Sequence, residues 1–94
     1  MTIYDKMNTI VKTHTQYVDN LNEKISYHVI LTDEFRKEIK KEVNIFYDEL
    51  REQEKELDLL AIGDLEEDMV HSFEFKVIEY FYNKYEKFLE YLDD

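Results

Sequence analysis

The near absence of residues that interrupt helices constrains this chain most. Its 94 residues include no proline and a single glycine, Gly63. Because proline and glycine mark most turns, a chain with so few of them is expected to form long, uninterrupted elements. All-β folds need frequent turn signals and are disfavoured for the same reason. The sequence therefore predicts one all-α domain that spans residues 1–94.

Helical periodicity divides this domain into three segments. Apolar residues recur every three or four positions over about residues 2–25, 33–62 and 65–92, which is the spacing of one helical face. Thr2 and Asp5 resemble a capping box at the first helix, and Thr32 is the expected N-cap of the second. The sequence leaves open whether residues 26–31 form helix, loop or strand.

Gly63 lies directly after the second apolar run. A glycine at this place is expected to end a helix in the left-handed conformation, and Asp64 and Glu67 are expected to cap the third helix. So short a link predicts a tight antiparallel hairpin of the second and third helices. The fold prediction is a three-helix bundle, which oligomerisation could complete.

The third segment is unusually rich in aromatic and aliphatic residues. One stripe contains Val70, Phe73, Val77, Phe81 and Phe88, and a second contains Phe75, Ile78, Tyr82, Tyr85, Leu89 and Leu92. Two stripes cover more of a helix than a three-helix bundle can enclose. The second stripe therefore predicts an interface, with a homo-oligomer expected, at Phe75, Ile78, Tyr82, Tyr85 and Leu89.

The net charge is −11, from 23 acidic and 12 basic residues. This balance argues against direct binding of nucleic acids or anionic membranes, because phosphate binding needs Lys and Arg. It favours a protein partner with a basic surface. The acids gather where the second and third helices meet, and those expected to bind the partner are Asp48, Glu49, Glu52, Glu56, Asp64, Glu66, Glu67 and Asp68.

Neither catalysis nor a cofactor is expected from the sequence. Its two serines lie outside any nucleophile elbow, and one glycine cannot build a phosphate-binding loop. Asp68-x-x-His71 resembles half of a carboxylate-histidine metal site, and Glu67, His71 and Glu74 share a helix face. No Glu-x-x-His motif elsewhere could complete such a site, and an acid-rich first turn is what the helix dipole favours. His14 lies in the apolar stripe of the first segment, where a hydrogen-bonded core histidine is favoured over a ligand or pH switch.

No cysteine, signal peptide or apolar stretch of ~20 residues is present, so a cytoplasmic location is expected. The leading functional hypothesis is an inhibitor or adaptor that docks an anionic helical surface on a basic, nucleic-acid-binding site of another protein. In composition the chain resembles the DNA-mimic inhibitors of phages and mobile elements, although the resemblance carries no motif. A homo-oligomeric structural bundle and a metal- or small-ligand-binding bundle are the alternatives.

Overall fold

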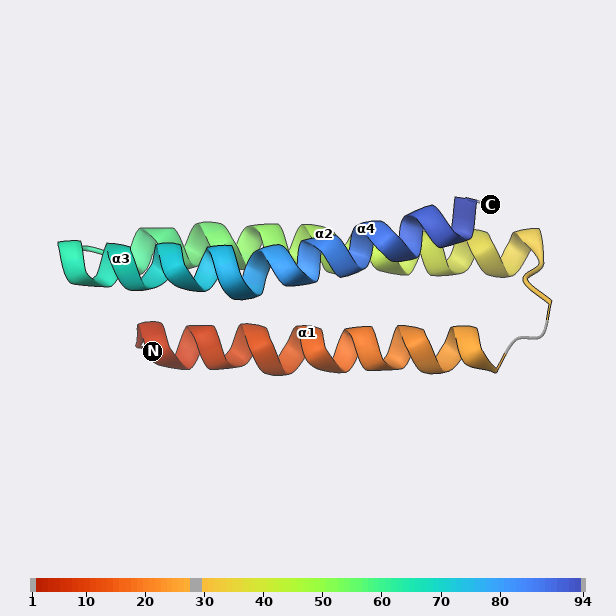
Figure 1. Cartoon of the computed structure of the whole chain (residues 1–94), viewed down its shortest axis with the longest axis horizontal. Helices are drawn as coiled ribbons and strands as arrows, with labels where there is room; N and C mark the ends of the chain where they lie inside the picture. Colours follow the sequence, from red (N-terminus) through yellow and green to blue (C-terminus); the bar gives the residue numbers. More distant parts are fainter. Residues whose placement is uncertain (1, 28–29, 94) are drawn as a thin grey trace.

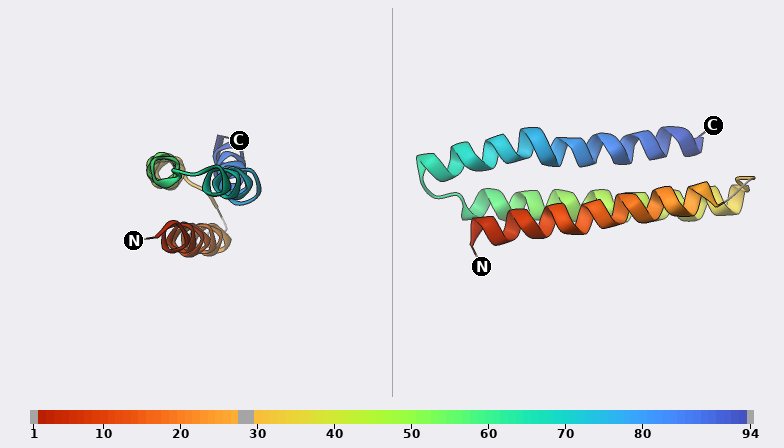
Figure 2. Two further views of the ribbon diagram at one scale, coloured as in Figure 1. Left: turned by 90° about the vertical axis from the view of Figure 1, so that its left-hand side faces the viewer. Right: turned by 60° about the horizontal axis from the view of Figure 1, so that its bottom comes forward.

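The computed structural model describes residues 2–27 and 30–93. Within those ranges the only regular secondary structure is helix. Helix α1 (Ile3–Ser26) is followed by α2 (Asp33–Leu60), and a third, continuous helix runs through α3 (Asp64–Phe73), a π-helical turn η1 (Glu74–Ile78) and α4 (Glu79–Asp93) (Figure 1). The three lie side by side in a slender bundle of 50 × 19 × 17 Å (Figure 2). The all-α prediction is thereby confirmed. Among the described helices, none has both the length and the apolar character that crossing a membrane requires.

The first two helices begin where the sequence predicts. Thr2 and Asp5 form a capping box, in which each side chain accepts a hydrogen bond of 3.2 Å from the other's backbone N–H. Thr32 Oγ1 accepts from the N–H of Phe35 at 3.1 Å. Of the segment left open by the sequence, Ser26 ends α1 and Tyr27 is its C-cap, while His28 and Val29 lie outside the described residues.

The predicted role of Gly63 is wrong. Its φ of −105° and ψ of 161° are extended, and it is the N-cap of α3 instead of a left-handed cap of α2. Helix α2 has already ended at Leu60, with Ala61 extended as its C-cap. No side chain caps α3 in the way predicted for Asp64 and Glu67. Instead, Glu66 Oε2 reaches back and accepts from the N–H of Ile62 at 3.2 Å.

One contiguous core runs the length of the bundle and is built from all three helices. The members with no more than about a hundredth of their surface exposed are Ile10 and Leu21 of α1, Val43, Leu50 and Leu57 of α2, Ile78 of η1, and Tyr85 and Leu92 of α4. Burial of this apolar surface is the main term that stabilises the fold.

The π turn explains why the third helix carries two apolar stripes. The N–H of Glu79 bonds to the carbonyl of Glu74, five residues earlier, so this turn holds one residue more than an α-helical turn. Val70 is buried before the turn, and Ile78, Tyr85 and Leu92 are buried after it. The step from Val70 to Ile78 is eight residues, whereas the later steps are seven. The extra residue therefore brings Ile78, Tyr85 and Leu92 of the second stripe into the core beside Phe81 of the first stripe, which is also buried after the turn.

The prediction that the second stripe forms an exposed interface needs correction for two of its members. Ile78 and Tyr85 have no exposed surface within the chain, so they are core residues. Tyr82 and Leu89 are half-buried and pack against the core. Phe75, on the solvent side of the π turn, is 76% exposed.

Candidate functional site

The end of the bundle where α2 joins α3 is strongly anionic, and we call residues 56–69 the tip. Between Lys55 and Lys76 the chain has no Lys or Arg, yet it has seven acids, namely Glu56, Asp58, Asp64, Glu66, Glu67, Asp68 and Glu74. In Figure 1 the α3 part of the tip extends beyond the first turn of α1. The tip therefore presents its α3 carboxylates and some of its apolar side chains to solvent, whereas Leu57 is buried in the core.

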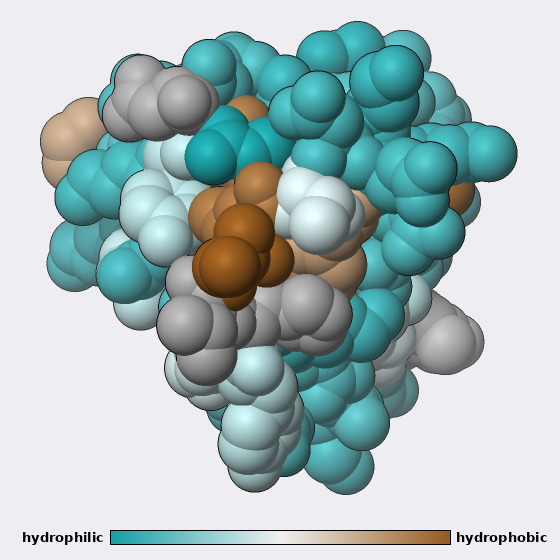
Figure 3. Space-filling model, turned by 90° about the vertical axis from the view of Figure 1, so that its right-hand side faces the viewer, coloured by the Kyte–Doolittle hydropathy of each residue, from teal (hydrophilic) through white to brown (hydrophobic). Residues whose placement is uncertain are grey.

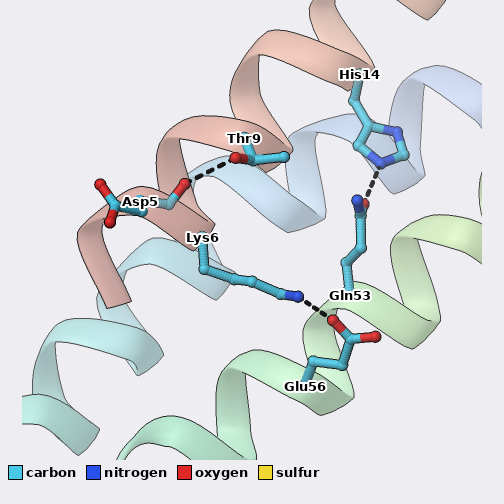
Figure 4. A network of polar contacts seen from close by, with 6 residues as sticks. All are labelled: Asp5, Lys6, Thr9, His14, Gln53 and Glu56. Atoms are coloured by element: carbon cyan, nitrogen blue, oxygen red, sulfur yellow. Dashed lines mark hydrogen bonds and ion pairs between the residues drawn. The ribbon is translucent and has the colours of Figure 1, made fainter. Parts of the chain in front are cut away.

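The eight acids predicted to bind a partner fall into two groups. Those on α2 have partners within the chain: Glu56 pairs with Lys6 of α1 (Figure 4), Glu49 accepts from the Tyr17 hydroxyl at 3.0 Å, Glu52 lies 3.5 Å from Lys55, and Asp48 lies 4.0 Å from Arg51. The four on α3, Asp64, Glu66, Glu67 and Asp68, are exposed.

No described cation pairs with the α3 acids. Asp64, Glu67 and Asp68 form no ion pair with any residue that the structure describes, and Glu66 is bound only to the backbone N–H of Ile62. The positive end of the α3 helix dipole partly offsets the negative charge of these acids. The acids of α3 therefore contribute to the outward negative field of the tip without a described counter-charge.

Aliphatic side chains stand among these acids, a feature that sequence reasoning missed. Leu59, Ile62 and Leu65 are 83%, 86% and 82% exposed. The sequence contained a partial signal, because Leu59 and Leu65 lie off the apolar stripes of their helices. Ile62 was assigned to the second helix, and its exposure follows from the end of α2 at Leu60.

A groove of about 500 Å³ crosses the tip beside these aliphatic residues. We call it the tip groove. The first turn of α1 and the α2–α3 link form its walls, and it is lined by Thr2, Ile3, Tyr4, Leu60, Ile62, Leu65, Glu66 and Met69. Five of these eight are aliphatic, one is aromatic and one, Glu66, is charged.

The opposite end of the bundle also exposes apolar groups. Viewed end-on there, the surface shows an apolar area with hydrophilic side chains above it (Figure 3). Ile30 is exposed at this end, and a groove beside Leu31 is lined by Arg36, Lys37 and Lys40 together with Asp33 and Asp93. Lys40 pairs with Asp93, so acids and bases are mixed at this end, unlike at the tip.

A second open groove, of about 640 Å³, lies over the π turn. Its walls include Glu54 and Tyr47 of α2 and Glu74, Phe75 and Tyr82 of the third helix. The Tyr82 hydroxyl donates to Glu54 Oε1 at 3.3 Å, and the Tyr47 and Tyr82 rings lie 4.8 Å apart. Beside this groove, α2 and the third helix are therefore joined by polar and aromatic contacts.

Glu74 is the most perturbed acid of the described residues. Its Oε1 is shielded from solvent and has no hydrogen-bond partner when the carboxyl is ionised. Burial, together with the neighbouring carboxyls of Asp58 and Glu54, raises the pKa of Glu74 to about 8. A proton on Glu74 would let its carboxyl donate a hydrogen bond to Asp58 or Glu54. Such a hydrogen bond accounts for three acids that lie together at one contact between helices.

His14 is enclosed in the core and is bonded at both ring nitrogens. Nδ1 lies 2.6 Å from the Tyr85 hydroxyl and Nε2 lies 2.7 Å from Gln53 Oε1 (Figure 4 shows the second contact). Burial lowers the pKa of His14. The residue has the environment of a hydrogen-bonded core histidine. Within residues 2–27 and 30–93, no group of three or more His, Cys, Asp or Glu residues could hold a metal ion.

Comparison with known proteins gives no relative: no family model, no curated protein and no solved structure matches the chain.

Proposed function

We propose that this protein is a non-catalytic binding module whose tip docks on a basic surface of another protein. The observation that supports this most is the set of α3 carboxylates, exposed and without a described cation, beside aliphatic side chains more than four-fifths exposed. Carboxylates steer and orient a basic partner, while desolvated apolar groups supply most of the binding free energy. Exposed aliphatic groups that lie together, as Ile62 and Leu65 do at the tip groove, are typical of an interaction surface, unlike single scattered ones.

The DNA-mimic form of the proposal is the more specific one. In it, the acids of α3 take the places of phosphates opposite Lys and Arg of a nucleic-acid-binding site. The partner is then an enzyme or regulator that binds nucleic acid, and this module inhibits it by occupying that site. Such binding competes with duplex DNA and weakens steeply as salt is added.

The test compares two variants of equal charge. The tip variant carries Asp64→Asn, Glu66→Gln, Glu67→Gln and Asp68→Asn, and the control carries Asp19→Asn, Glu23→Gln, Glu38→Gln and Glu90→Gln, which are exposed acids far from the tip. A partner is first identified by cross-linking in cells of the source organism. Its affinity for the parent and both variants is then measured over a salt series, with and without duplex DNA.

We expect the tip variant to bind at least ~10-fold more weakly, while the control stays near the parent protein. Equal losses in the two variants would mean that net charge alone matters, and would contradict a docking role for the tip. Binding that is insensitive to salt would contradict the electrostatic proposal altogether. Affinity unaffected by DNA would remove the mimic form and leave an adaptor.

The homo-oligomeric alternative retains one exposed residue of the predicted interface, Phe75, while Tyr82 and Leu89 are half-buried. Light scattering over a range of concentrations separates a monomer of 11.6 kDa from a dimer. A stable dimer that Phe75→Lys dissociates would support this alternative. A charged residue at Tyr85 would be a test of folding instead, since that side chain is fully buried.

A further inference from the structure

The tip groove provides an apolar contact surface within the anionic end of the bundle. Ile62 and Leu65 stand above the groove with more than four-fifths of their surface exposed, and Ile3, Leu60 and Met69 line it further in. Its volume of about 500 Å³ is in the range that receives a few side chains of a ligand. The groove is therefore able to contribute hydrophobic binding energy that carboxylates alone do not supply.

The charge around the groove selects among possible occupants. Glu66 lines it, and Asp64, Glu67 and Asp68 lie on the same two turns of α3 with no Lys or Arg between Lys55 and Lys76 in the sequence. A second copy that docked tip to tip would bring the same carboxylates against these, and like charges in an interface cost several kcal/mol. A segment with Lys or Arg beside its apolar residues meets both requirements of the surface.

An amphipathic helix is the form of segment that fits an open apolar groove with charged edges. Its aliphatic residues recur on one face at i, i+3, i+4 and i+7, and its polar flanks lie on either side of that face. Laid along the tip groove, such a helix would place its apolar face on Ile62 and Leu65 and its basic flank near Glu66 and Asp68. The groove would thus contact the apolar face of the helix, and the acids would contact its basic flank.

We propose that the tip groove is the docking site for a basic amphipathic helix of the partner protein. This inference rests on the proposed function and makes it more specific, because it names the apolar contact and the form of the recognised segment. The acids of α3 orient the helix, and Ile62 with Leu65 anchors it.

The test uses a synthetic peptide of leucine and lysine, patterned as an amphipathic helix of about four turns, or ~14 residues. Binding to the full chain is followed by NMR chemical shifts and by calorimetry. The groove variant carries Ile62→Ser and Leu65→Ser. The matched control carries Ile30→Ser and Ile45→Ser, two exposed aliphatic residues that lie outside the tip and do not line the groove. All four positions are at the surface, so both variants are expected to fold.

The expected result is shift changes centred on α3 and the first turn of α1, with an affinity at least ~10-fold lower in the groove variant and within ~2-fold of the parent in the control. A peptide with the same composition but a scrambled pattern, and one with Glu in place of Lys, should both bind more weakly than the patterned basic peptide.

Three outcomes would overturn the groove. Equal affinity for parent and groove variant would show that the peptide is held by charge alone, and if the charge-neutral tip variant then loses it, the proposed function stands while this inference fails. Equal binding of patterned and scrambled peptides would exclude a helix as the ligand. A parent protein that self-associates until Leu65→Ser makes it monomeric would assign the groove to a second copy of the chain.

Discussion

Tyr85 of α4 and His14 of α1 form a buried hydrogen bond in which the phenol oxygen lies 2.6 Å from Nδ1. Neither side chain has any exposed surface. Burial lowers the pKa of His14, so the imidazole is neutral and carries one N–H. Because Gln53 Oε1 of α2, 2.7 Å from Nε2, can only accept, that N–H is on Nε2 and the Tyr85 hydroxyl donates to Nδ1. One polar side chain thus links all three helices inside the core.

Removal of the Tyr85 hydroxyl is expected to destabilise the fold. Tyr85→Phe leaves Nδ1 of His14 buried without a donor, and an unsatisfied buried polar group costs about 1–3 kcal/mol. Urea unfolding followed by circular dichroism measures this loss. Tyr91→Phe is the matched control, since Tyr91 is exposed on the same helix, and it should change stability by less than about 0.5 kcal/mol. Similar values for both variants would contradict the hydrogen bond.

The protonation state of His14 gives a second prediction. Burial holds its pKa below the ordinary value of 6.5, so the unfolded chain binds a proton that the folded chain does not. Stability should therefore fall as the pH drops below about 6.5. NMR of the ring nitrogens should show a neutral imidazole with the proton on Nε2 at pH 7. A His14 ring that takes up a proton at or above pH 6.5 in the folded chain would show that the described network is wrong.

Glu74 should make the stability of the fold decrease as the pH rises, which is opposite to the effect of His14. The folded chain keeps its proton up to about pH 8, whereas the unfolded chain releases it near 4.5, so the folded state binds more protons between these values. Stability from this group is complete below pH 4.5 and is lost as the pH rises towards 8. Glu74→Gln, which cannot ionise, should raise the melting temperature at pH 8 and remove part of this decline.

The control for Glu74 is Glu90→Gln, a change of the same charge at an exposed position of α4. It should shift melting temperatures little and equally at pH 5 and pH 8. If Glu74→Gln also gives a uniform shift, the carboxyl is not protonated in the folded state at neutral pH. Carbon-13 NMR of the Glu74 carboxyl would report the same point directly.

The π turn predicts an unusual response to deletion. Removing Phe75 should turn residues 74–78 into ordinary α-helix while the core residues on both sides keep their places, so the fold should survive with a change of about 1 kcal/mol or less. Removing Glu86 instead rotates Phe88 and Leu92 by about 100°. Because Leu92 is buried, this deletion should cost about 2 kcal/mol or more. Thermal unfolding compares the two, and equal losses would contradict the register argument.

Replacement of Gly63 by serine should change stability in opposite directions for an extended and for a left-handed backbone. In its extended backbone a Cβ would meet nothing within 4 Å, so Gly63→Ser should fit without strain, cap α3 and stabilise the chain by about 0.5–1 kcal/mol. A left-handed residue at this position would instead make the serine destabilising by about 1 kcal/mol. Equilibrium unfolding of the single variant decides between the two conformations.

Local signals in the sequence located the helices well. Thr2 with Asp5, and Thr32, begin α1 and α2 through short-range hydrogen bonds that depend only on neighbouring residues. Gly63 was misassigned because both a left-handed cap and an extended N-cap accept glycine, and the sequence does not distinguish them. The second stripe of the third helix was misread because a strict helical period was assumed, whereas the π turn shifts Ile78 and Tyr85 into the core.

The candidate site was only partly predictable for a related reason. The acids of α3 were identified from composition, but which carboxylates have partners depends on contacts between helices, such as Lys6 of α1 with Glu56 of α2. The exposure of Leu59, Ile62 and Leu65 depends on how far α1 reaches along the bundle. Glu74 meets Asp58 only because the third helix turns back along α2, so a tertiary contact sets its pKa.

The extra residue in the π turn also affects how this sequence should be aligned with that of a relative. A relative that lacks the insertion would have the same core with one residue fewer between Phe73 and Glu79. Alignment of such a relative without a gap would match Ile78, Tyr85 and Leu92 to solvent-facing positions and would make two equivalent helices look unrelated. A single-residue gap placed within residues 74–78 restores the correspondence along the whole helix.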